Sequence, residues 1–354
     1  MPDPTRYPRD ALESFATAAF VRAGLPEVDA GAVAALMVES QAQGSEGHAL
    51  MRIPHYVRRI QAGGVNPRPD IRVVEERAAM ALIDGDNGMG HLVMLRAAQL
   101  AIAKARTAGT AWVGTRWSNH AGPASLYARM ALEHGMVGMY LAVGSANHLP
   151  PWGGLDMLLS TNPIAVAIPT EEEPPVVLDM ATTVAAFGKI KTAMLRGESM
   201  PEGWMVDRQG RPLTDPKRAF EEGILLPIGG YKGYGLALVF GLLAGTLNGA
   251  AMGKDVVDFN HDDTTATNTG QALLVIDPAA FGDPLEFRRR VDTVVRDIRA
   301  SERMPGVERI RLPGEQSHAK RLESARLGIP IDEALKKSLD QLADQLGIPR
   351  LQGD

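Results

Sequence analysis

The sequence predicts an α/β fold, in which strands and helices alternate through a layered central domain and further helices flank it at both ends. Between residues 79 and 276, short apolar runs alternate with longer runs of helical period, which is the pattern of stacked sheet and helix layers. The chain has 354 residues, 45% of them hydrophobic and 22% charged, so it is long enough to bury a large core. At about 150 residues per domain, this length predicts about two domains.

The first part of the chain is predicted to be helical. Apolar residues recur at helical spacing after Asp10, which is a candidate N-cap, and again over residues 29–42. A third helix is expected over residues 53–61, and the glycine pair Gly63-Gly64 ends it.

The middle of the chain supplies the predicted sheet. Strands are expected at residues 79–84, 110–115, 136–143, 164–169, 175–180 and 272–276. Helices are expected between them at residues 92–108, 121–134, 185–196 and 235–247. From Pro284 to Ile348 the chain is charged and helical again, and we expect these last helices to pack with the first ones. The predicted regions are an N-terminal helical region (1–75), a central α/β domain (76–285) and a C-terminal helical region (286–354).

One uncharged segment, residues 233–252, has the length of a membrane span. Gly241, Gly245 and Gly249 form a pattern of small residues four apart. The segment is nevertheless rich in glycine, contains Asn248 and stands alone in the sequence. We therefore expect a buried helix whose glycines let another backbone approach closely.

Composition and charge exclude several classes of protein. The chain contains no cysteine, which excludes disulfides, thiolate zinc sites, iron–sulfur clusters and cysteine nucleophiles. Its formal net charge is -5, so no overall basic field attracts nucleic acid or an anionic membrane. The N-terminal sequence MPDPTRYPRDALESF lacks the basic patch and apolar core of a signal peptide, and we expect a cytoplasmic protein.

Familiar cofactor and nucleophile motifs are absent from the sequence. No G-x-G-x-x-G follows a predicted strand, so the Rossmann dinucleotide fingerprint is missing. The patterns G-x-x-x-x-G-K-[ST], H-E-x-x-H and G-x-S-x-G are missing too.

The segment GHALMRIPHY places His48 and Arg52 four residues apart, on one face of the segment if it is helical. A guanidinium matches the fork of a carboxylate, and an imidazole exchanges protons near neutral pH. Together they could hold a 2-oxo acid by its carboxylate and protonate its carbonyl oxygen. The alternative is a solvated helix face without a function.

A second polar group, Ser118, Asn119 and His120 in RWSNHAGPAS, falls between a predicted strand and a predicted helix. Ligands of layered α/β domains bind at such strand ends, and a helix N-terminus offers free N–H groups to an anion. The alternative is that Ser118 or Asn119 only caps the helix and that His120 is incidental.

Further glycine-rich turns carry isolated polar residues beside predicted strands. The triplet Thr161-Asn162-Pro163 could fix a small polar group, whereas Asp179 could equally be a cap or a loop ligand. In PIGGYKGYGLA, Lys232 lies between glycines, where the backbone can approach a phosphate and the ammonium can bind it. The segment RLPGEQSHAKR contains a Pro-Gly turn after a short strand-like run.

Together these segments resemble one family. The motifs, in chain order, are GHALMRIPHY, DGDNGMG, SNHAG, PWGG, TNPIAVAIP, LDMAT, GKI, PEGW, DRQGRPLTDP, GGYKGYGLAL and LPGE. Their order is similar to that of the malate/L-lactate dehydrogenase-like (sulfolactate dehydrogenase-like) family, and it extends from about residue 10 to 345. That family includes ureidoglycolate dehydrogenases, diketogulonate reductases and Δ1-piperideine-2-carboxylate reductases.

The resemblance implies a fold, a cofactor, a reaction and a partner. It implies a three-layer α/β/α arrangement with a mixed sheet, a non-Rossmann fold whose central domain binds NAD or NADP. It implies an NAD(P)-dependent oxidoreductase that interconverts a small 2-oxo acid, or a cyclic 2-imino acid, and the 2-hydroxy or amino acid. It also implies a homodimer.

The resemblance further assigns residues to roles, and it implies no metal. His48 and His120 are the implied catalytic histidines. The implied substrate-binding residues are Arg52, Tyr56 and Thr161. The implied cofactor-binding residues are His120, Asn162, Asp179, Met180, Ala181, Lys232, Gly233, Pro313, Gly314 and Glu315.

Two departures from the family pattern bear on the mechanism. Gly47 stands where the family has a serine before the catalytic histidine, so a hydroxyl that orients His48 in relatives is missing. His148 is an additional histidine in AVGSANHLPPWGG. We expect either an altered substrate or proton transfer led by His120.

Two other functions stay open at this point. Six residues could gather into the metal site of a hydrolase or lyase, although their spacing is not that of a ligand set: His91, His120, His148, His261, Asp262 and Asp263. Alternatively, Gly47 in place of the serine favours a relative that binds the dinucleotide without turnover.

Overall fold

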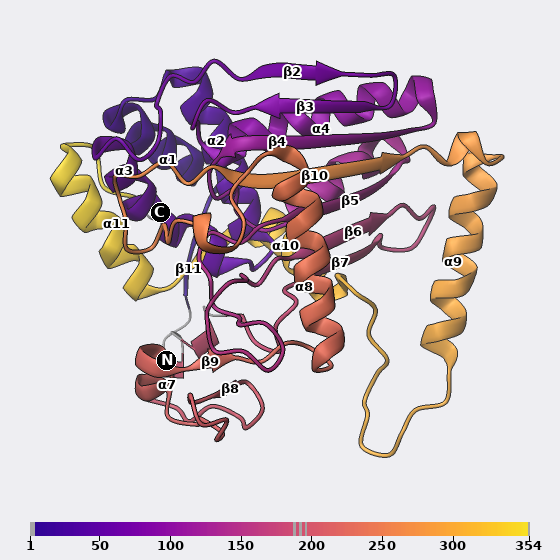
Figure 1. Cartoon of the computed structure of the whole chain (residues 1–354). Helices are drawn as coiled ribbons and strands as arrows, with labels where there is room; N and C mark the ends of the chain where they lie inside the picture. Colours follow the sequence, from indigo (N-terminus) through magenta and orange to yellow (C-terminus); the bar gives the residue numbers. More distant parts are fainter. Residues whose placement is uncertain (1–3, 187–188, 191–192, 195–196, 353–354) are drawn as a thin grey trace.

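The computed structural model describes residues 4–186, 189–190, 193–194 and 197–352, and its centre is a seven-stranded sheet (Figure 1). The strands, in their order across the sheet, are β2 (Arg72–Glu76), β3 (Met80–Asp84), β4 (Thr110–Ser118), β10 (Thr269–Ile276), β5 (Val137–Ala142), β6 (Ile164–Ile168) and β7 (Val176–Met180). Within this sheet β3 and β4 run parallel, and every other neighbouring pair is antiparallel. The mixed sheet is confirmed, and it differs from the parallel sheet to which the missing Rossmann fingerprint belongs.

All six predicted strands are present within a few residues of their expected bounds. The seventh strand, β2, was not predicted, because its sequence RVVEE is short, charged and largely exposed at the sheet edge. It pairs with β3 through a register shift between Val73 and Glu75. Such an irregularity is typical of edge strands and removes the strict alternation that identifies a strand.

Helices cover both faces of the sheet (Figure 1). Helices α4 (Gly90–Ala108) and α5 (Ser125–Met130) pack on one face, and α8 (Tyr231–Ala244) packs on the other. The helix predicted over 121–134 is wrong at its start, because Gly122 has a left-handed φ of 80° and Pro123 follows it. Residues 131–134 continue α5 as a 3₁₀ turn. The helix predicted over 185–196 lies partly outside the described residues.

The two ends of the chain form a further helical layer. It contains α1 (Arg9–Ala23), α2 (Glu27–Ala42), α3 (Ile53–Gln61), α10 (Glu315–Leu327) and α11 (Glu333–Leu346). Helix α11 contacts α1 and α3, and α10 contacts α2. The short strands β1 (Thr5–Tyr7) and β11 (Ile329–Ile331) pair antiparallel and join the termini. The apolar core of this layer includes Phe20, Met37, Ile53 and Leu339, all fully buried.

The predicted N-cap Asp10 is wrong. Helix α1 begins directly after Pro8, whose extended backbone ends the preceding segment, and no side chain caps it. Asp10 instead lies in the first turn of α1. A carboxylate there still favours the helix, because it interacts with the positive end of the helix dipole.

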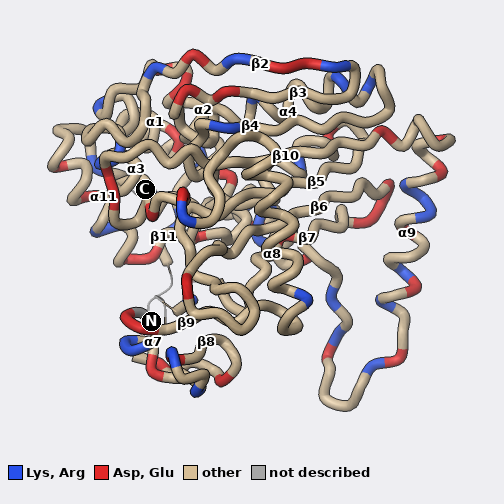
Figure 2. The backbone as a smooth tube through the Cα atoms, viewed as in Figure 1, with Lys and Arg blue, Asp and Glu red and all other residues tan. Residues whose placement is uncertain are grey.

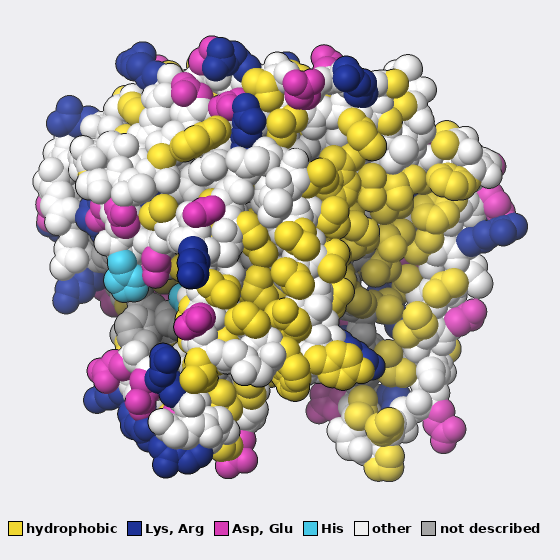
Figure 3. Space-filling view, viewed as in Figure 1, with side chains coloured by type: hydrophobic (Ala, Val, Ile, Leu, Met, Phe, Trp, Pro, Cys, Tyr) yellow, Lys and Arg dark blue, Asp and Glu magenta, His cyan; other side chains and the backbone are white. Residues whose placement is uncertain are grey.

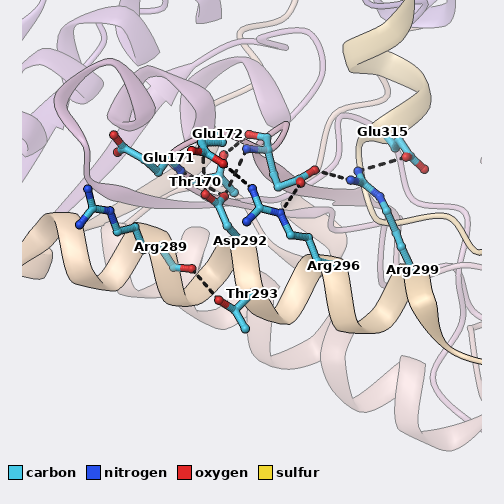
Figure 4. A network of polar contacts seen from close by, with 10 residues as sticks. Thr170, Glu171, Glu172, Arg289, Asp292, Thr293, Arg296, Arg299 and Glu315 are labelled. Carbon is cyan, nitrogen blue, oxygen red and sulfur yellow. Dashed lines mark hydrogen bonds and ion pairs between the residues drawn. The ribbon is translucent and has the colours of Figure 1, made fainter.

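Helix α9 (Pro284–Ala300) lies apart from the terminal helices and is charged along its length (Figures 1 and 2). It is fixed to the turn between β6 and β7 by Asp292, a buried carboxylate. Asp292 accepts the backbone N–H groups of Glu171, Glu172 and Glu173 at 3.2, 2.9 and 3.2 Å. Arg296 binds the carboxylates of Glu172 and Glu173 beside it (Figure 4).

A small unit near residues 200–225 has a core of its own. It contains β8 (Met205–Val206), α7 (Pro216–Glu222) and β9 (Ile224–Leu225), and β8 pairs with β9. Met205, Leu213 and Leu225 are buried within it.

Of the uncharged segment predicted to be a buried helix, residues 233–244 lie in α8, and only one face of α8 is buried. That face carries small residues, Gly233, Ala237, Gly241 and Ala244. The opposite face exposes large apolar side chains, so the prediction of a fully buried helix is wrong for this chain by itself. Among the described residues, no helix is long and apolar enough to cross a membrane.

Candidate active site

The first candidate residues lie on two short 3₁₀ turns between α2 and α3. His48 ends the turn Glu46–His48, and Arg52 ends the turn Leu50–Arg52. The two residues therefore do not lie on one α-helical face as predicted, because α3 begins only at Ile53. A hydrogen bond joins the two turns instead: the Nε of Arg52 donates to the carbonyl oxygen of Gly47, the residue before His48, at 2.9 Å.

His120 approaches His48 from the turn after β4. Its Nε2 lies 3.2 Å from the Nδ1 of His48, and the two rings stack with centroids 5.2 Å apart. Asn119 fixes this turn, because its buried amide donates to the carbonyl oxygens of Asn87 and Gly88 at 3.1 and 2.9 Å. Neither Ser118 nor Asn119 caps α5, so the alternative of a simple helix cap is wrong.

Tyr56 lies behind His120 on α3. It is only 2% exposed, and its hydroxyl lies 2.5 Å from the Nδ1 of His120. The backbone N–H of Gly122 donates to the same Nδ1 at 3.3 Å. The ring of buried His91 meets Tyr56 edge to face at 5.6 Å. Tyr56, predicted to bind substrate, thus directs its hydroxyl to a histidine.

Phe259 and Asn260 complete this cluster, and sequence reasoning missed both. The ring of Phe259 stacks on His120 with centroids 5.0 Å apart and 9° between the planes. The guanidinium of Arg52 lies 5.5 Å from the same ring, and one of its terminal nitrogens donates to the Oδ1 of Asn260 at 3.2 Å. The only sequence signal was one aromatic residue in the polar stretch DFNHDD.

The loop that carries Phe259 is held by a buried arginine. Arg59 is 1% exposed and donates to the carbonyl oxygens of Gly64, Asp262 and Thr265. A buried guanidinium needs such a set of acceptors, because its donors would otherwise lose their hydrogen bonds to water. Arg59 therefore fixes the loop against α3.

The site histidines are uncharged at neutral pH. Burial, followed by the charge of Arg52, lowers the pKa of His48 to about 4, although part of its side chain remains exposed. Burial, followed by the neighbouring His48 and Arg52, lowers the pKa of His120 well below its usual value. Burial raises the pKa of Tyr56, so its phenol stays protonated.

A second group of predicted residues lies where β6 begins and β7 ends. Thr182 donates to the carbonyl oxygen of Thr161 through its backbone N–H at 2.9 Å and its hydroxyl at 2.8 Å. Asp179, paired with Ala165 in the sheet, accepts the N–H of Ser125 at 3.0 Å and so ties β7 to the first turn of α5. Met180 and Ala181 follow directly and are half-buried.

Asn162 has its polar atoms engaged inside the protein. Its Oδ1 accepts the N–H of Gly144 at 3.0 Å, and its Nδ2 donates to the carbonyl oxygen of Ala237 at 2.7 Å. The side chain is fully buried. Asn162 thus connects the end of β5 to α8.

Two uncapped helix starts carry the remaining predicted residues. No side chain caps α8 after Gly230, and Lys232 in its first turn is exposed and makes no ion pair within the described residues. No side chain caps α10 after Gly314 either. Free N–H groups at helix starts and an available ammonium suit the phosphates of a dinucleotide.

The turn before α10 packs against β7. The carbonyl oxygen of Pro313 accepts the N–H of Val177 at 3.1 Å. A Cβ on Gly314 would lie 2.7 Å from the carbonyl oxygen of Val177, so the approach requires glycine. The carboxylate of Glu315 binds Arg299 at 3.2 Å, at the end of the network around α9 (Figure 4).

The structure therefore brings the predicted residues together in two groups. His48, Arg52, Tyr56 and His120 form one, and the other borders β7. Within the described residues, Thr161 makes no hydrogen bond to the first group. The described residues also contain no group of three or more His, Cys, Asp or Glu side chains placed to hold a metal ion.

Paired histidines, a nearby guanidinium and uncapped helix starts in a mixed-sheet α/β protein are the features of an enzyme that could bind a small anionic substrate. A family model described as malate/L-lactate dehydrogenase matches residues 7–340. The chain therefore belongs to the malate/L-lactate dehydrogenase family, and the predicted family and enzyme class, a dehydrogenase or reductase, are confirmed.

Similar proteins agree in sequence and in fold. The chain is 38% identical over 353 residues to the malate dehydrogenase of Pyrococcus horikoshii, covering 98% of this chain and 97% of that protein. It is 38% identical over 325 residues to the L-sulfolactate dehydrogenase of Methanocaldococcus jannaschii, covering 92% of each. The solved structure of the Pyrococcus enzyme matches with a TM-score of 0.90 over 99% of this chain and 98% of that one, at 36% identity.

Proposed function

We propose that the chain uses NADH or NADPH to reduce a small 2-oxo acid, or a cyclic 2-imino acid, reversibly to the 2-hydroxy or amino acid. The observation that carries this proposal is the contact between His48 and His120 beside the guanidinium of Arg52. Relatives named for malate, sulfolactate and Δ1-piperideine-2-carboxylate support it, because these compounds share a carboxylate beside the reacting carbon.

Arg52 binds the substrate carboxylate. Its Nε and one terminal nitrogen are engaged with Gly47 and Asn260, and this fixes the plane of the guanidinium. The remaining N–H groups form a planar pair of donors that can bind both oxygens of a carboxylate. This would hold the reacting carbon in one orientation. Thr161 supplies a hydroxyl from the second group.

His48 exchanges the proton at the substrate oxygen or nitrogen, because its side chain is exposed while that of His120 is half-buried. Reduction consumes one proton, which His48 takes up from solvent and passes to the substrate, so that its imidazole is neutral again after each turnover. His120 supports His48 from behind through their shared hydrogen bond. The dinucleotide supplies the hydride when bound. The ring of Phe259 stacks on His120 and holds the plane of its imidazole.

The dinucleotide is proposed to bind along the end of β7. Lys232, Gly233 and the first turn of α8 would hold its phosphates, and Pro313, Gly314 and Glu315 would line the other edge of β7. Asp179, Met180 and Ala181 would contact it between these segments, and His120 would lie at its nicotinamide end. Asn162 would act there by joining β5 to α8, since its side chain is fully buried and its polar atoms are engaged. Glu315 would act by shaping its turn, since its carboxylate is bound to Arg299.

The experiment is an assay of NADH and NADPH oxidation at 340 nm against six compounds. These are pyruvate, oxaloacetate, 2-oxoglutarate, sulfopyruvate, diketogulonate and Δ1-piperideine-2-carboxylate. Turnover on an oxo acid would assign a hydroxy-acid dehydrogenase, and turnover on the imine alone would assign a reductase that forms an amino acid. Binding of either nucleotide without any turnover would contradict the proposal for these substrates.

A second copy of the chain is the proposed partner, and α8 is its proposed contact. Leu236, Val239 and Leu242 on this helix are 40%, 49% and 44% exposed. Figure 3 shows a broad apolar area over α8, and Figure 2 shows no charge on this helix beyond Lys232. Burial of such an area is favourable between two copies. Light scattering should give twice the chain mass of 37.9 kDa, and Val239→Asp should give the single mass.

A further inference from the structure

The hydrogen bonds behind the site histidines have a direction that the backbone fixes. The Nδ1 of His120 faces both the hydroxyl of Tyr56 and the backbone N–H of Gly122. A backbone amide can only donate a hydrogen bond. The N–H of Gly122, at 3.3 Å, therefore favours the tautomer in which the Nδ1 of His120 carries a lone pair and no proton, and the closer hydroxyl of Tyr56 is needed to complete this preference.

The rest of the chain of hydrogen bonds follows from this nitrogen. Burial raises the pKa of Tyr56, so the phenol keeps its proton and donates it to the same Nδ1. Neutral His120 then holds its one proton on Nε2, which lies 3.2 Å from the Nδ1 of His48. His48 accepts this hydrogen bond, so its own proton lies on Nε2.

We propose that Tyr56 and the amide of Gly122 set the tautomers of both histidines, so that the resting enzyme presents the Nε2–H of His48 to its substrate. Tyr56 is then a positioning residue that acts through His120. This inference rests on the proposed function, and it adds that the resting site is preset to donate a hydrogen bond to a carbonyl oxygen or an imine nitrogen. It also names what orients His48 in place of the serine hydroxyl missing at Gly47.

The same arrangement makes the two directions of the reaction unequal. Oxidation of a hydroxy acid requires the Nε2 of His48 to take a proton, so its own proton must move to Nδ1. His120 would then carry its proton on Nδ1, against the N–H of Gly122. The resting enzyme therefore has to change both tautomers before it can take the proton of a hydroxy acid, whereas it can donate a hydrogen bond to an oxo acid without any change.

Among the described residues, the charges that face His120 agree with this assignment. The titratable and charged groups that face His120 are His48, Arg52, His91 and His55. Burial lowers the pKa of His91 to about 3, and burial and Arg58 lower that of His55 to about 4. Arg52 is thus the one cation among these four groups at neutral pH.

The test is ¹⁵N NMR of the full chain with labelled histidines, without substrate, at pH 7.5. His48→Gln and His120→Gln assign the two signals. We expect both residues to carry the proton on Nε2 alone, and a His120 protonated on Nδ1 would overturn the inference. Because no substrate is present, this result does not depend on the proposed reaction.

Tyr56→Phe tests the positioning residue itself. Without the phenol, His120 should show a mixture of tautomers, and the pH profile of kcat should move to higher pH because the pKa of His120 rises. The expected loss of kcat for reduction is about tenfold, within the range of acid–base effects. Tyr7→Phe is the matched control, since Tyr7 is equally buried but lies at the terminal strands. A Tyr56→Phe spectrum with both histidines unchanged would overturn the role of Tyr56.

Discussion

The Nδ1 of His48 and the Nε2 of His120 lie 3.2 Å apart, although 72 residues separate them in the chain. Their ring planes are nearly parallel, with 21° between them. The contact joins the turn before α3 to the turn after β4. A change in the protonation of one histidine therefore changes the hydrogen bond that the other can make.

Replacing either histidine by alanine should reduce turnover. His48→Ala removes the group proposed to exchange the proton, and His120→Ala removes its partner. We expect kcat to fall about a hundredfold or more for His48→Ala and at least tenfold for His120→Ala, because a positioned acid or base contributes about 10²–10⁴-fold. Steady-state kinetics of reduction measure both. Near-full turnover in both variants would show that neither histidine acts in catalysis.

Replacing Arg52 by lysine should weaken substrate binding. Lysine keeps the charge but loses the planar fork and the bond from Nε to Gly47. We expect kcat/KM to fall at least tenfold, mainly through KM. Arg58→Lys, on the helix that follows Arg52, is the control, because Arg58 is exposed and pairs with Asp263 instead. Equal kinetics of the two variants would contradict the role of Arg52.

Restoring the family serine as Gly47→Ser should be tolerated without a gain in rate. Apart from Gly47 and its two chain neighbours, no described heavy atom lies within 4 Å of the position that a Cβ would take, so the side chain fits without a clash. Replacing glycine should stabilise the fold by up to about 1 kcal/mol, because the unfolded chain loses freedom. His120 already orients His48, so we expect kcat within threefold of wild type. A tenfold gain would show that the missing hydroxyl limits this enzyme.

Stability should fall as the pH drops below 6.5, and His91 should account for part of the loss. Burial lowers the pKa of this fully buried imidazole to about 3, so the unfolded chain binds a proton that the folded chain rejects. The free energy of unfolding therefore decreases from pH 6.5 downward until the pH reaches the folded pKa. Between pH 6.5 and 5, the loss from one such group is about 2 kcal/mol.

His91→Leu should flatten this dependence, measured by denaturant unfolding at pH 7.5, 6.5, 5.5 and 5. Leucine fills a similar volume and takes up no proton. His134→Leu, at an exposed histidine, should follow the wild-type curve. A His91→Leu curve parallel to that of wild type would show that another group causes the acid lability.

Much of the fold could be predicted from the spacing of apolar residues, because this spacing decides which side of a strand or helix is buried. The apolar residues of the six predicted strands are buried in the sheet, so the need for burial leaves a recognisable apolar pattern in the sequence. β2 was missed because an exposed edge strand needs no such period. The helix predicted from residue 121 begins at Ser125, because Gly122 lies in a turn whose backbone N–H donates to the Nδ1 of His120.

The candidate site was predictable only in part. His48 and His120 stood out because imidazoles in glycine-rich turns suggest chemistry, and the structure places them in contact. Phe259 and Arg59 could not be found, because their roles arise from a long-range approach of the loop to α3. The division of the chain at residues 75 and 285 and the cytoplasmic location stay predictions.

The most direct test of the proposed reaction follows the hydride itself. Enzyme, the preferred acid and dinucleotide deuterated at C4 of the nicotinamide, in either configuration, are incubated together, and the product is analysed by NMR and mass spectrometry. We predict one deuterium at C2 of the hydroxy or amino acid from one of the two configurations, and about a hundredth of that product or less with His48→Ala over the same time. Product without deuterium from either configuration, or with deuterium at another carbon, would contradict hydride transfer to the carbon beside the carboxylate.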